Sequence, residues 1–316
     1  MAARIGVVAA ILIAGAAHAQ SPETLAWLRK MYDATHKLSY SGTFVYQQGA
    51  RSETSQITRF GAGDIERLEV IDGVPREIVR TRDTVRCYLP DSKVVKVEPR
   101  ATDRTFPALV PGEVSALAKH YDISLGETRR IANFDCQAIL LKPKDSLRYG
   151  YKLYADANSG MLVKAVTMDS GGETIEQITF TQLAIGKVTR DMVRPRYSVG
   201  TWRIIDAEAS PAHLAGWGLS SELPGFRKVV ELKRRLGESP AAGHMVYSDG
   251  LAAVSVFIEP LETARKDPAR IGLASVGAIH MYTREVANHM VTVVGEAPAV
   301  SVQRIANAVE YREIRK

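Results

Sequence analysis

The sequence lacks the short motifs that mark the common classes of enzyme. Its 316 residues contain no G-x-S-x-G turn, no H-E-x-x-H pattern, no C-x-x-C pair and no phosphate-binding glycine loop. Gly61 and Gly63 resemble part of a dinucleotide-binding loop, but they precede a predicted strand, whereas such a loop opens a helix. His244 and His280 lie in predicted strands, where packing is a more common role than metal binding. We therefore predict that the protein is not an enzyme and uses no cofactor or metal, with a hydrolase as the least favoured alternative.

The sequence also lacks an apolar run of the about 20 residues that a membrane-spanning helix needs. A shorter apolar run, residues 5–17, follows Arg4 and leads into Ala17-His18-Ala19. This arrangement predicts a secretory signal peptide, residues 1–19, that is cleaved between Ala19 and Gln20. A membrane anchor is the alternative, but it requires a longer run. We expect an exported protein of residues 20–316 that resides in the periplasm.

Cysteine is scarce, with only Cys87 and Cys136 in the chain. In the oxidising periplasm an isolated pair within one domain favours a disulfide. Two buried thiols that pack as small apolar groups are the alternative. The compartment, rather than any geometry, is the basis of the disulfide prediction.

The charge is mildly basic, because the formal net charge is +6 and falls to +5 when Arg4 leaves with the signal peptide. Such a balance is compatible with an anionic lipid, a polysaccharide or an acidic peptide as a partner. The sequence has no interleaving of aromatic and basic residues of the kind that a strand-binding groove needs. We therefore exclude nucleic acid as a partner.

The clearest structural pattern is the alternation of apolar and polar residues between Ser39 and Asp91, interrupted by turn pairs such as Asp72-Gly73. This period of two predicts antiparallel strands joined by tight turns. Further strand-like pieces follow at 128–141, 149–156, 161–168 and 173–185. We expect nine to eleven strands, with helices at 22–38 and 112–121 and a long loop at 93–111. No predicted helix is long enough to cover the apolar faces of these strands. The sheet must therefore curl on itself or pack on a neighbouring sheet.

Residues 195–225 follow no regular period and mark a linker or boundary between two domains. For Trp202 and Trp217 within it, we favour a packing role over a role as exposed anchors for a partner. Beyond it, hairpins are predicted from pieces at 244–247 and 252–258, and at 275–283 and 288–294. A helix at 298–311 carries one apolar stripe. Four antiparallel strands backed by a terminal helix form a small α+β domain.

Several short segments occur in one order along the chain: 39–46, 66–68, 72–77, 87–88, 121–122, Cys136 and 172–177. Together they resemble the MucB/RseB family of periplasmic negative regulators of the envelope-stress, or alginate-type, sigma factor. The resemblance continues into the last hundred residues. It implies a mainly β protein in which residues 20–210 form an unclosed, lipoprotein-carrier-like antiparallel barrel that wraps helices. A linker at 211–225 and the small α+β domain at 226–316 would follow.

The resemblance also implies a function. The C-terminal domain would bind the periplasmic domain of a membrane anti-sigma factor of the RseA or MucA type and protect it from proteolysis. The N-terminal domain would sense lipopolysaccharide or another acylated amphiphile. A periplasmic lipid or lipoprotein carrier is the alternative, but a carrier has no evident need of the C-terminal domain. Whether the protein forms a homo-oligomer is left open.

Two sets of candidate binding residues follow from these expectations. The lipid-binding set combines aromatic side chains for the concave face with cations for an anionic head group: Phe44, Tyr46, Tyr88, Lys93, Lys96, Arg100 and Arg104. The partner-binding set combines a basic flank with a neighbouring strand that offers a face or an edge: Arg227, Lys228, Lys233, Arg234, Arg235, His280 and Tyr282. No metal ligands or catalytic residues are assigned.

Overall fold

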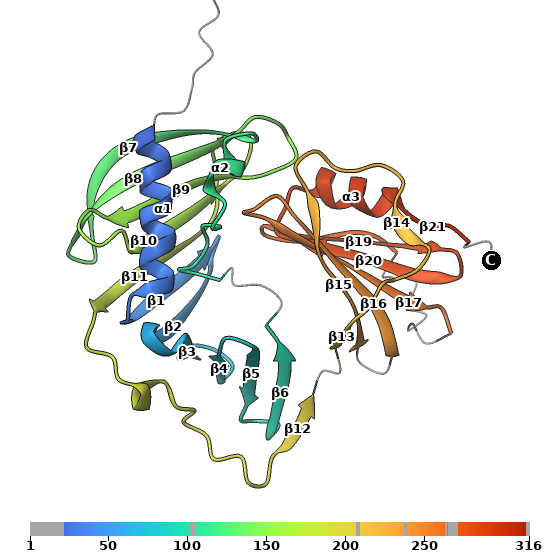
Figure 1. Cartoon of the computed structure of the whole chain (residues 1–316), viewed down its shortest axis with the longest axis horizontal. Helices are drawn as coiled ribbons and strands as arrows, with labels where there is room; N and C mark the ends of the chain where they lie inside the picture. Colours follow the sequence, from blue (N-terminus) through green and yellow to red (C-terminus); the bar gives the residue numbers. More distant parts are fainter. Residues whose placement is uncertain are drawn as a thin grey trace, which may run out of the picture.

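The structure is a computed structural model that describes residues 22–100, 105–206, 209–236, 239–262, 264 and 271–313. The predicted signal peptide and its cleavage site at Ala19 and Gln20 lie outside these residues. Two large sheets adjoin one another, and each carries its own helix (Figure 1). Within the described ranges, the helices are too short or too polar to cross a membrane.

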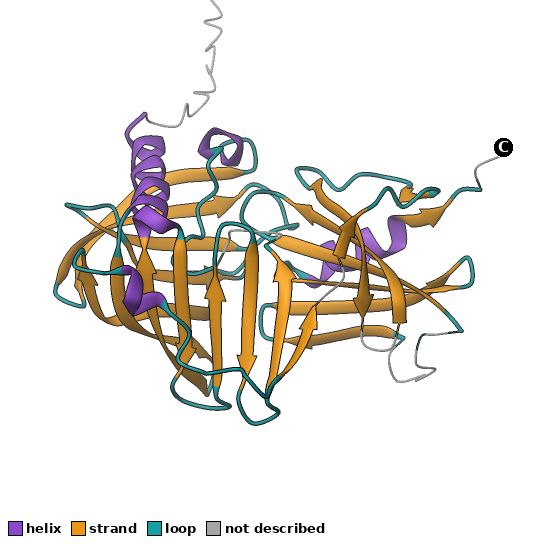
Figure 2. Cartoon of the chain, turned by 60° about the horizontal axis from the view of Figure 1, so that its bottom comes forward, coloured by secondary structure: helices purple, strands orange, loops and turns teal. Residues whose placement is uncertain are grey.

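The first sheet has twelve strands in the order β12-β6-β5-β4-β3-β2-β1-β11-β10-β9-β8-β7, and every pair is antiparallel except β12 with β6. It is strongly curved and open at both edges (Figure 2). The strands are β1 Tyr40–Gln48, β2 Arg51–Phe60, β3 Ile65–Val70, β4 Arg76–Arg80, β5 Thr84–Leu89, β6 Val94–Pro99, β7 Tyr121–Ile131, β8 Phe134–Pro143, β9 Gly150–Asp156, β10 Leu162–Met168, β11 Thr174–Ile185 and β12 Arg203–Asp206. The predicted fold class, a mainly β protein with an unclosed antiparallel sheet, is confirmed.

The inner face of this sheet is covered by α1 (Pro22–Lys37), which begins at a proline and lies across β7 to β11 (Figure 1). Leu28 and Met31, one helical turn apart, are fully buried in the first core. Complete burial of an aliphatic side chain of this size contributes about 1.5–3 kcal/mol. The short helix α2 (Val114–Leu117) adds two buried side chains, and the 3-10 turns η1 (Gly61–Gly63) and η2 (Arg190–Val193) complete the helical part. A helix therefore fills the hollow that an uncovered sheet would leave.

The chain between the two sheets packs on the outer strands of the first. Trp202 stacks on Tyr197 with ring centroids 5.3 Å apart, and both rest on a small cluster of Val79, Tyr88 and Val95. Trp202 is thus a packing residue, as predicted.

The second sheet has seven strands in the order β13-β15-β16-β17-β20-β19-β18. Its core lies between the sheet and α3 (Ala299–Ala308), whose Val302, Ile305 and Ala306 are buried. The strands are β13 Ala209–Pro211, β15 Arg227–Leu236, β16 Ser239–Ser248, β17 Ala253–Pro260, β18 Gly272–Val276, β19 Ile279–Val286 and β20 His289–Gly295. A separate pair, β14 Trp217–Leu219 and β21 Val309–Tyr311, closes one end of this core.

Several predicted elements have different bounds in the structure. The piece at 128–141 spans two strands, because Ala132 and Asn133 adopt positive φ and turn the chain between β7 and β8. The piece at 275–283 likewise contains the β18–β19 turn at Gly277. The terminal helix stops at Ala308, after which the chain continues as β21. The helix predicted at 112–121 shrinks to α2, since Tyr121 already pairs with Pro143 in the sheet.

The segment 211–225, predicted as a linker, is packed rather than free. Leu214 and Leu223 are buried in the second core, and β14 pairs with β21. The second domain therefore has seven sheet strands where the alternation predicted four.

Candidate functional site

A buried ion pair joins the two sheets. Arg148, in the turn between β8 and β9, donates to Asp249 in the β16–β17 turn over 3.0 Å, and neither side chain is exposed. The same guanidinium bonds both carboxylate oxygens of Asp145 and the Pro224 carbonyl. The Tyr121 hydroxyl donates to Asp249 at 3.1 Å. Burial, and then the charge of Asp249, raises the pKa of Tyr121, so the hydroxyl stays a donor.

Apolar side chains cross the same junction in both directions. Leu147 of the first sheet packs in the second core, and Leu251 of the second sheet packs against the first core. The Ser301 hydroxyl at the start of α3 donates to the Leu147 carbonyl over 2.6 Å. This exchange of side chains ties the two sheets together at one end.

A second contact involves His280, which was predicted to bind a partner. Its Nε2 lies 2.9 Å from the Tyr149 hydroxyl, and its Nδ1 lies 2.6 Å from the Ser275 hydroxyl. Burial lowers the pKa of His280. Both ring nitrogens are thus engaged within the chain, and the predicted role is corrected to a contact between the sheets.

The remaining partner-binding residues do not form one surface. Arg227, Lys233 and Arg235 on β15 are exposed. Lys228 pairs with Glu231, while Arg234 reaches Glu98 on β6 of the first sheet over 3.1 Å. Tyr282 packs against the second core, and three strands separate β15 from β19. Only the exposed cations of β15 stay available for the predicted use.

The predicted lipid-binding residues do not lie together on one surface either. Phe44 is buried against Phe106 and Phe180, with centroids 5.2 and 5.9 Å away, inside the core that α1 covers. Tyr88 belongs to the separate cluster on β5, and the Tyr46 hydroxyl donates to Glu176 over 2.8 Å. The predicted aromatic lining is therefore divided between two clusters.

The predicted cations for a lipid head group are also dispersed. Lys93 and Lys96 are exposed on and next to β6. Arg100 donates to the Thr81 carbonyl over 2.8 Å and pairs with Asp64 at 3.5 Å. Arg104 lies outside the described residues. A head-group site formed by this set stays a prediction, and Arg100 already interacts with Thr81 and Asp64 of the same chain.

The predicted disulfide is wrong, because Cys87 and Cys136 are free thiols on β5 and β8. Seven strands lie between β5 and β8 in the order of the first sheet, so neighbouring-strand pairing does not bring the two side chains together. Burial raises the pKa of Cys87, and burial followed by Asp156 raises the pKa of Cys136 to about 12. Cys136 is buried in the first core, as the alternative of a small packing group expects, whereas Cys87 is only half-buried.

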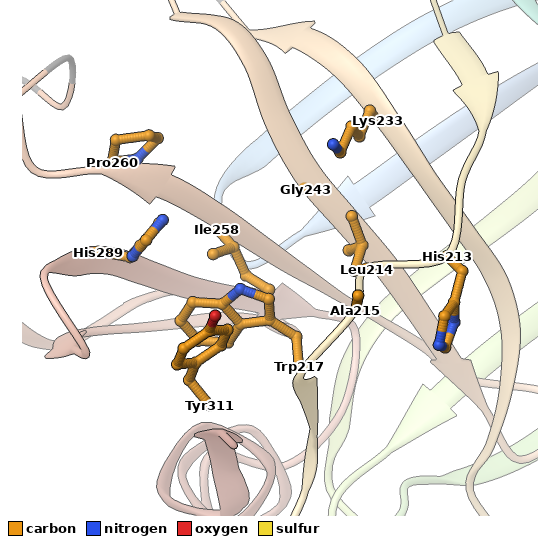
Figure 3. A pocket seen from close by; sticks show the side chains of 10 residues that line it. All are labelled: His213, Leu214, Ala215, Trp217, Lys233, Gly243, Ile258, Pro260, His289 and Tyr311. Carbon is orange, nitrogen blue, oxygen red and sulfur yellow. The ribbon is translucent and has the colours of Figure 1, made fainter. Parts of the chain in front are cut away.

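The structure reveals an aromatic pocket that the sequence did not predict (Figure 3). Trp217 on β14 stacks on Tyr311 of β21 and meets the edge of His289, with centroid distances of 5.2 and 5.1 Å. Lys233 of β15 reaches the rim, and the hollow has a volume of about 320 Å³. Trp217 stood out in the sequence as a residue that could contribute to such a pocket. Tyr311 did not, because it was predicted to lie at the end of a helix.

Gly216 makes this pocket sterically feasible. Its φ is +84°, and a Cβ at this position would lie 2.6 Å from the Arg312 carbonyl oxygen and 2.7 Å from the Tyr311 ring. Only glycine combines this backbone conformation with such a close approach. The turn before β14 therefore sets the distance between Trp217 and Tyr311.

Comparisons with known proteins place both halves of the chain. The model of the MucB/RseB N-terminal domain matches residues 23–197, and the model of the MucB/RseB C-terminal domain matches residues 211–310. The sigma factor AlgU regulatory protein MucB of Pseudomonas aeruginosa is 30% identical over 301 residues, which cover 91% of this chain and 90% of that protein. The sigma-E factor regulatory protein RseB of Escherichia coli is 24% identical over 315 residues, covering 97% and 96% respectively.

Solved structures agree. A crystal structure of MucB in complex with MucA(peri) superposes with a TM-score of 0.69 at 27% identity, covering 92% of this chain and 99% of that one. Another crystal structure of MucB superposes with a TM-score of 0.69 at 25% identity. The similarity thus extends through both sheets.

Proposed function

This chain belongs to the MucB/RseB family, and from that premise we propose that it is a periplasmic regulatory binding protein for an envelope-stress sigma factor. It binds the periplasmic domain of a membrane anti-sigma factor and protects it from proteolysis, rather than catalysing a reaction. The observation that carries the proposal is the match over both domains to relatives that are named regulators, one of them solved with MucA(peri). We also propose that residues 226–316 bind the partner and that residues 20–210 respond to lipid.

The partner's docking surface would be the β15 side of the second sheet, where the aromatic pocket opens. Tryptophan, tyrosine and arginine dominate the binding energy of interfaces, and they act best in pockets that exclude water. Trp217 and Tyr311 line the aromatic pocket, and Lys233 is at its rim. The exposed Arg227 and Arg235 would raise the association rate with an acidic segment.

The junction around Arg148 and Asp249 would transmit a lipid signal to this surface. An amphiphile bound near the first sheet changes partner affinity only if it stabilises one relative placement of the sheets over another. A buried ion pair at the point of contact makes the placement seen in this structure costly to leave. Lipopolysaccharide or another acylated amphiphile would therefore weaken the grip on the partner through this junction.

The test uses the full mature chain, residues 20–316, and the periplasmic domain of the anti-sigma factor. We expect capture by the wild-type chain, slower cleavage of the captured domain by protease, and at least tenfold weaker capture by Lys233→Glu combined with Trp217→Ala. Lys142→Glu, on the exposed side of β8, is the matched charge control and should bind normally. Equal capture by the double variant, with circular dichroism unchanged, would place the partner elsewhere on the molecule.

A further inference from the structure

The second sheet has a face that neither core uses. Cross-strand pairing defines this back face, opposite α3, because paired residues point to the same side of a sheet: Leu232 pairs with His244, His244 with Phe257, Val246 with Ser255, Ser255 with Val294, and Val294 with Met281. Phe257, Val294 and Met281 are half-buried and belong to none of the hydrophobic clusters. An apolar strip thus runs from β16 to β19 beside the first sheet, interrupted by Ser255 and by the hydrogen-bonded pair Thr283 and Thr292.

Polar atoms without partners lie at one end of that strip. His244 is only 6% exposed, yet neither of its ring nitrogens has a hydrogen-bond partner. The Nε of Arg234, two residues beyond the pairing partner of His244, is buried and unpartnered as well. Buried polar groups are nearly always hydrogen-bonded, so three such atoms on one patch require an explanation.

The ring of His244 is held in place. It stacks on Phe257 with centroids 4.3 Å apart and planes inclined by 14°. Burial, and then the charge of Arg234, lowers the pKa of His244 to about 4, so the ring is a neutral donor and acceptor. Arg234 pairs with Ala242, two residues before His244 on the neighbouring strand, so the two side chains lie diagonally on the same face of the sheet.

We infer that the back face binds an oxyanion, a carboxylate or a phosphate, carried on an apolar chain. The oxyanion accepts hydrogen bonds from the Nε–H of Arg234 and the ring N–H of His244, and the chain lies on Phe257, Val294 and Met281. This geometry stands on its own, while its biological use rests on the lipid response proposed above. It revises one part of the division proposed above: α1 and Phe106 already fill the concave face of the first sheet, so the apolar chain is placed on the second sheet instead.

Binding at this place has a consequence for the junction of the sheets. The counter-ion of Arg234 is Glu98 on β6, part of the first sheet, and Glu98 is 43% exposed. An incoming oxyanion competes with Glu98 for the same guanidinium. Ligand binding therefore weakens a contact between the two sheets at the end away from Arg148.

The experiment measures binding by calorimetry with the full mature chain and three probes below their micelle-forming concentrations. Sodium decanoate carries both the acid and the chain, decyl maltoside carries the chain alone, and acetate carries the acid alone. We expect decanoate to bind the wild type at least tenfold more tightly than either of the other probes. A decyl maltoside affinity equal to that of decanoate would overturn the oxyanion site, and an equal acetate affinity would overturn the role of the strip.

Variants locate the site. Arg234→Gln and His244→Phe should each weaken decanoate binding at least tenfold, or about 1.4 kcal/mol, whereas Arg304→Gln on the exposed side of α3 should leave it unchanged. Glu98→Gln removes the competitor and should strengthen binding severalfold, an effect that a purely structural ion pair would not produce. Unchanged decanoate affinity in both Arg234→Gln and His244→Phe contradicts the proposal.

Two further measurements keep this test separate from folding and from partner binding. If Arg234→Gln fails to fold, the histidine side-chain resonances of the wild type decide, since decanoate must shift those of His244. Capture of the anti-sigma domain without amphiphile should be the same in wild type and in His244→Phe. If the wild-type chain does not capture the anti-sigma domain, the proposed function is contradicted. The oxyanion site is still tested, because decanoate binding is measured separately.

Discussion

The inner face of the first sheet is covered by α1 and Phe106, whereas the back face of the second sheet leaves Phe257, Val294 and Met281 half-buried. Both faces are apolar, but only the first has a helix of the same chain to cover it. The first face therefore contributes stability, because its apolar surface is removed from water on folding. The second keeps apolar surface that a ligand can still bury. At its polar end the Nε of Arg234 and both ring nitrogens of His244 lack hydrogen-bond partners.

The contact that holds these two regions together should give the largest effect. Arg148→Met leaves the fully buried carboxylate of Asp249 without its cation, and breaking a buried pair from one side costs about 3–5 kcal/mol. Urea unfolding should show that loss relative to wild type, while Lys142→Met, exposed on β8, stays within about 0.5 kcal/mol. An unchanged midpoint in Arg148→Met would mean that the sheets do not depend on this pair.

Truncating one apolar side chain in each face should cost more stability in the covered face of the first sheet than in the half-buried back face of the second. Leu28→Ala, in the part of α1 with no exposure, should cost about 2–5 kcal/mol. Phe257→Ala on the back face should cost less than half of that, although it removes a larger side chain. Arg29→Ala, on the exposed side of α1, is the control in the same thermal unfolding series. Equal losses at Leu28 and Phe257 would contradict the distinction between the faces.

Acid should destabilise the half-open face through His244, whose pKa is lowered from 6.5 to about 4 in the folded chain. The unfolded chain binds this proton first, so its contribution to stability is complete above about pH 6.5 and falls as the pH drops toward 4. At pH 5 the loss amounts to about 2 kcal/mol. His244→Phe lacks the titrating group beside Arg234 and Glu98, so the difference between its stability and that of wild type should depend on pH over this window. A pH-independent difference would show that the folded pKa of His244 is ordinary.

The smallest effect is expected at the aromatic pocket. Gly216→Ala forces an L side chain into a φ of +84° and against Tyr311, which costs about 1–2 kcal/mol. The same change should displace Tyr311 from Trp217 and weaken capture of the anti-sigma domain. Gly49→Ala is a matched control, because its φ is also positive but its Cβ would meet open space. Equal capture by both variants would separate the pocket from partner binding.

The sequence alone predicted most of the architecture. The period of two through residues 39–91 and the proline at the start of α1 indicated an antiparallel sheet with an N-terminal helix, and both are present. That the sheet stays unclosed was implied by the family resemblance. These are local signals, since alternation and helix starts depend on neighbouring residues. The family was recognisable for a related reason, because its short segments keep one order along the chain.

Only the tertiary structure decided which residues meet. Cys87 and Cys136 lie in the same sheet but on β5 and β8, and strand order is a long-range property that alternation does not encode. Arg234 and His280 were assigned to a partner surface, yet each faces the first sheet, because a pattern with a period of two separates two faces without saying what each one contacts. The sequence determined the strands and the family, while the packing of one sheet against the other determined which cations are free, which apolar face is filled and which is left for a ligand.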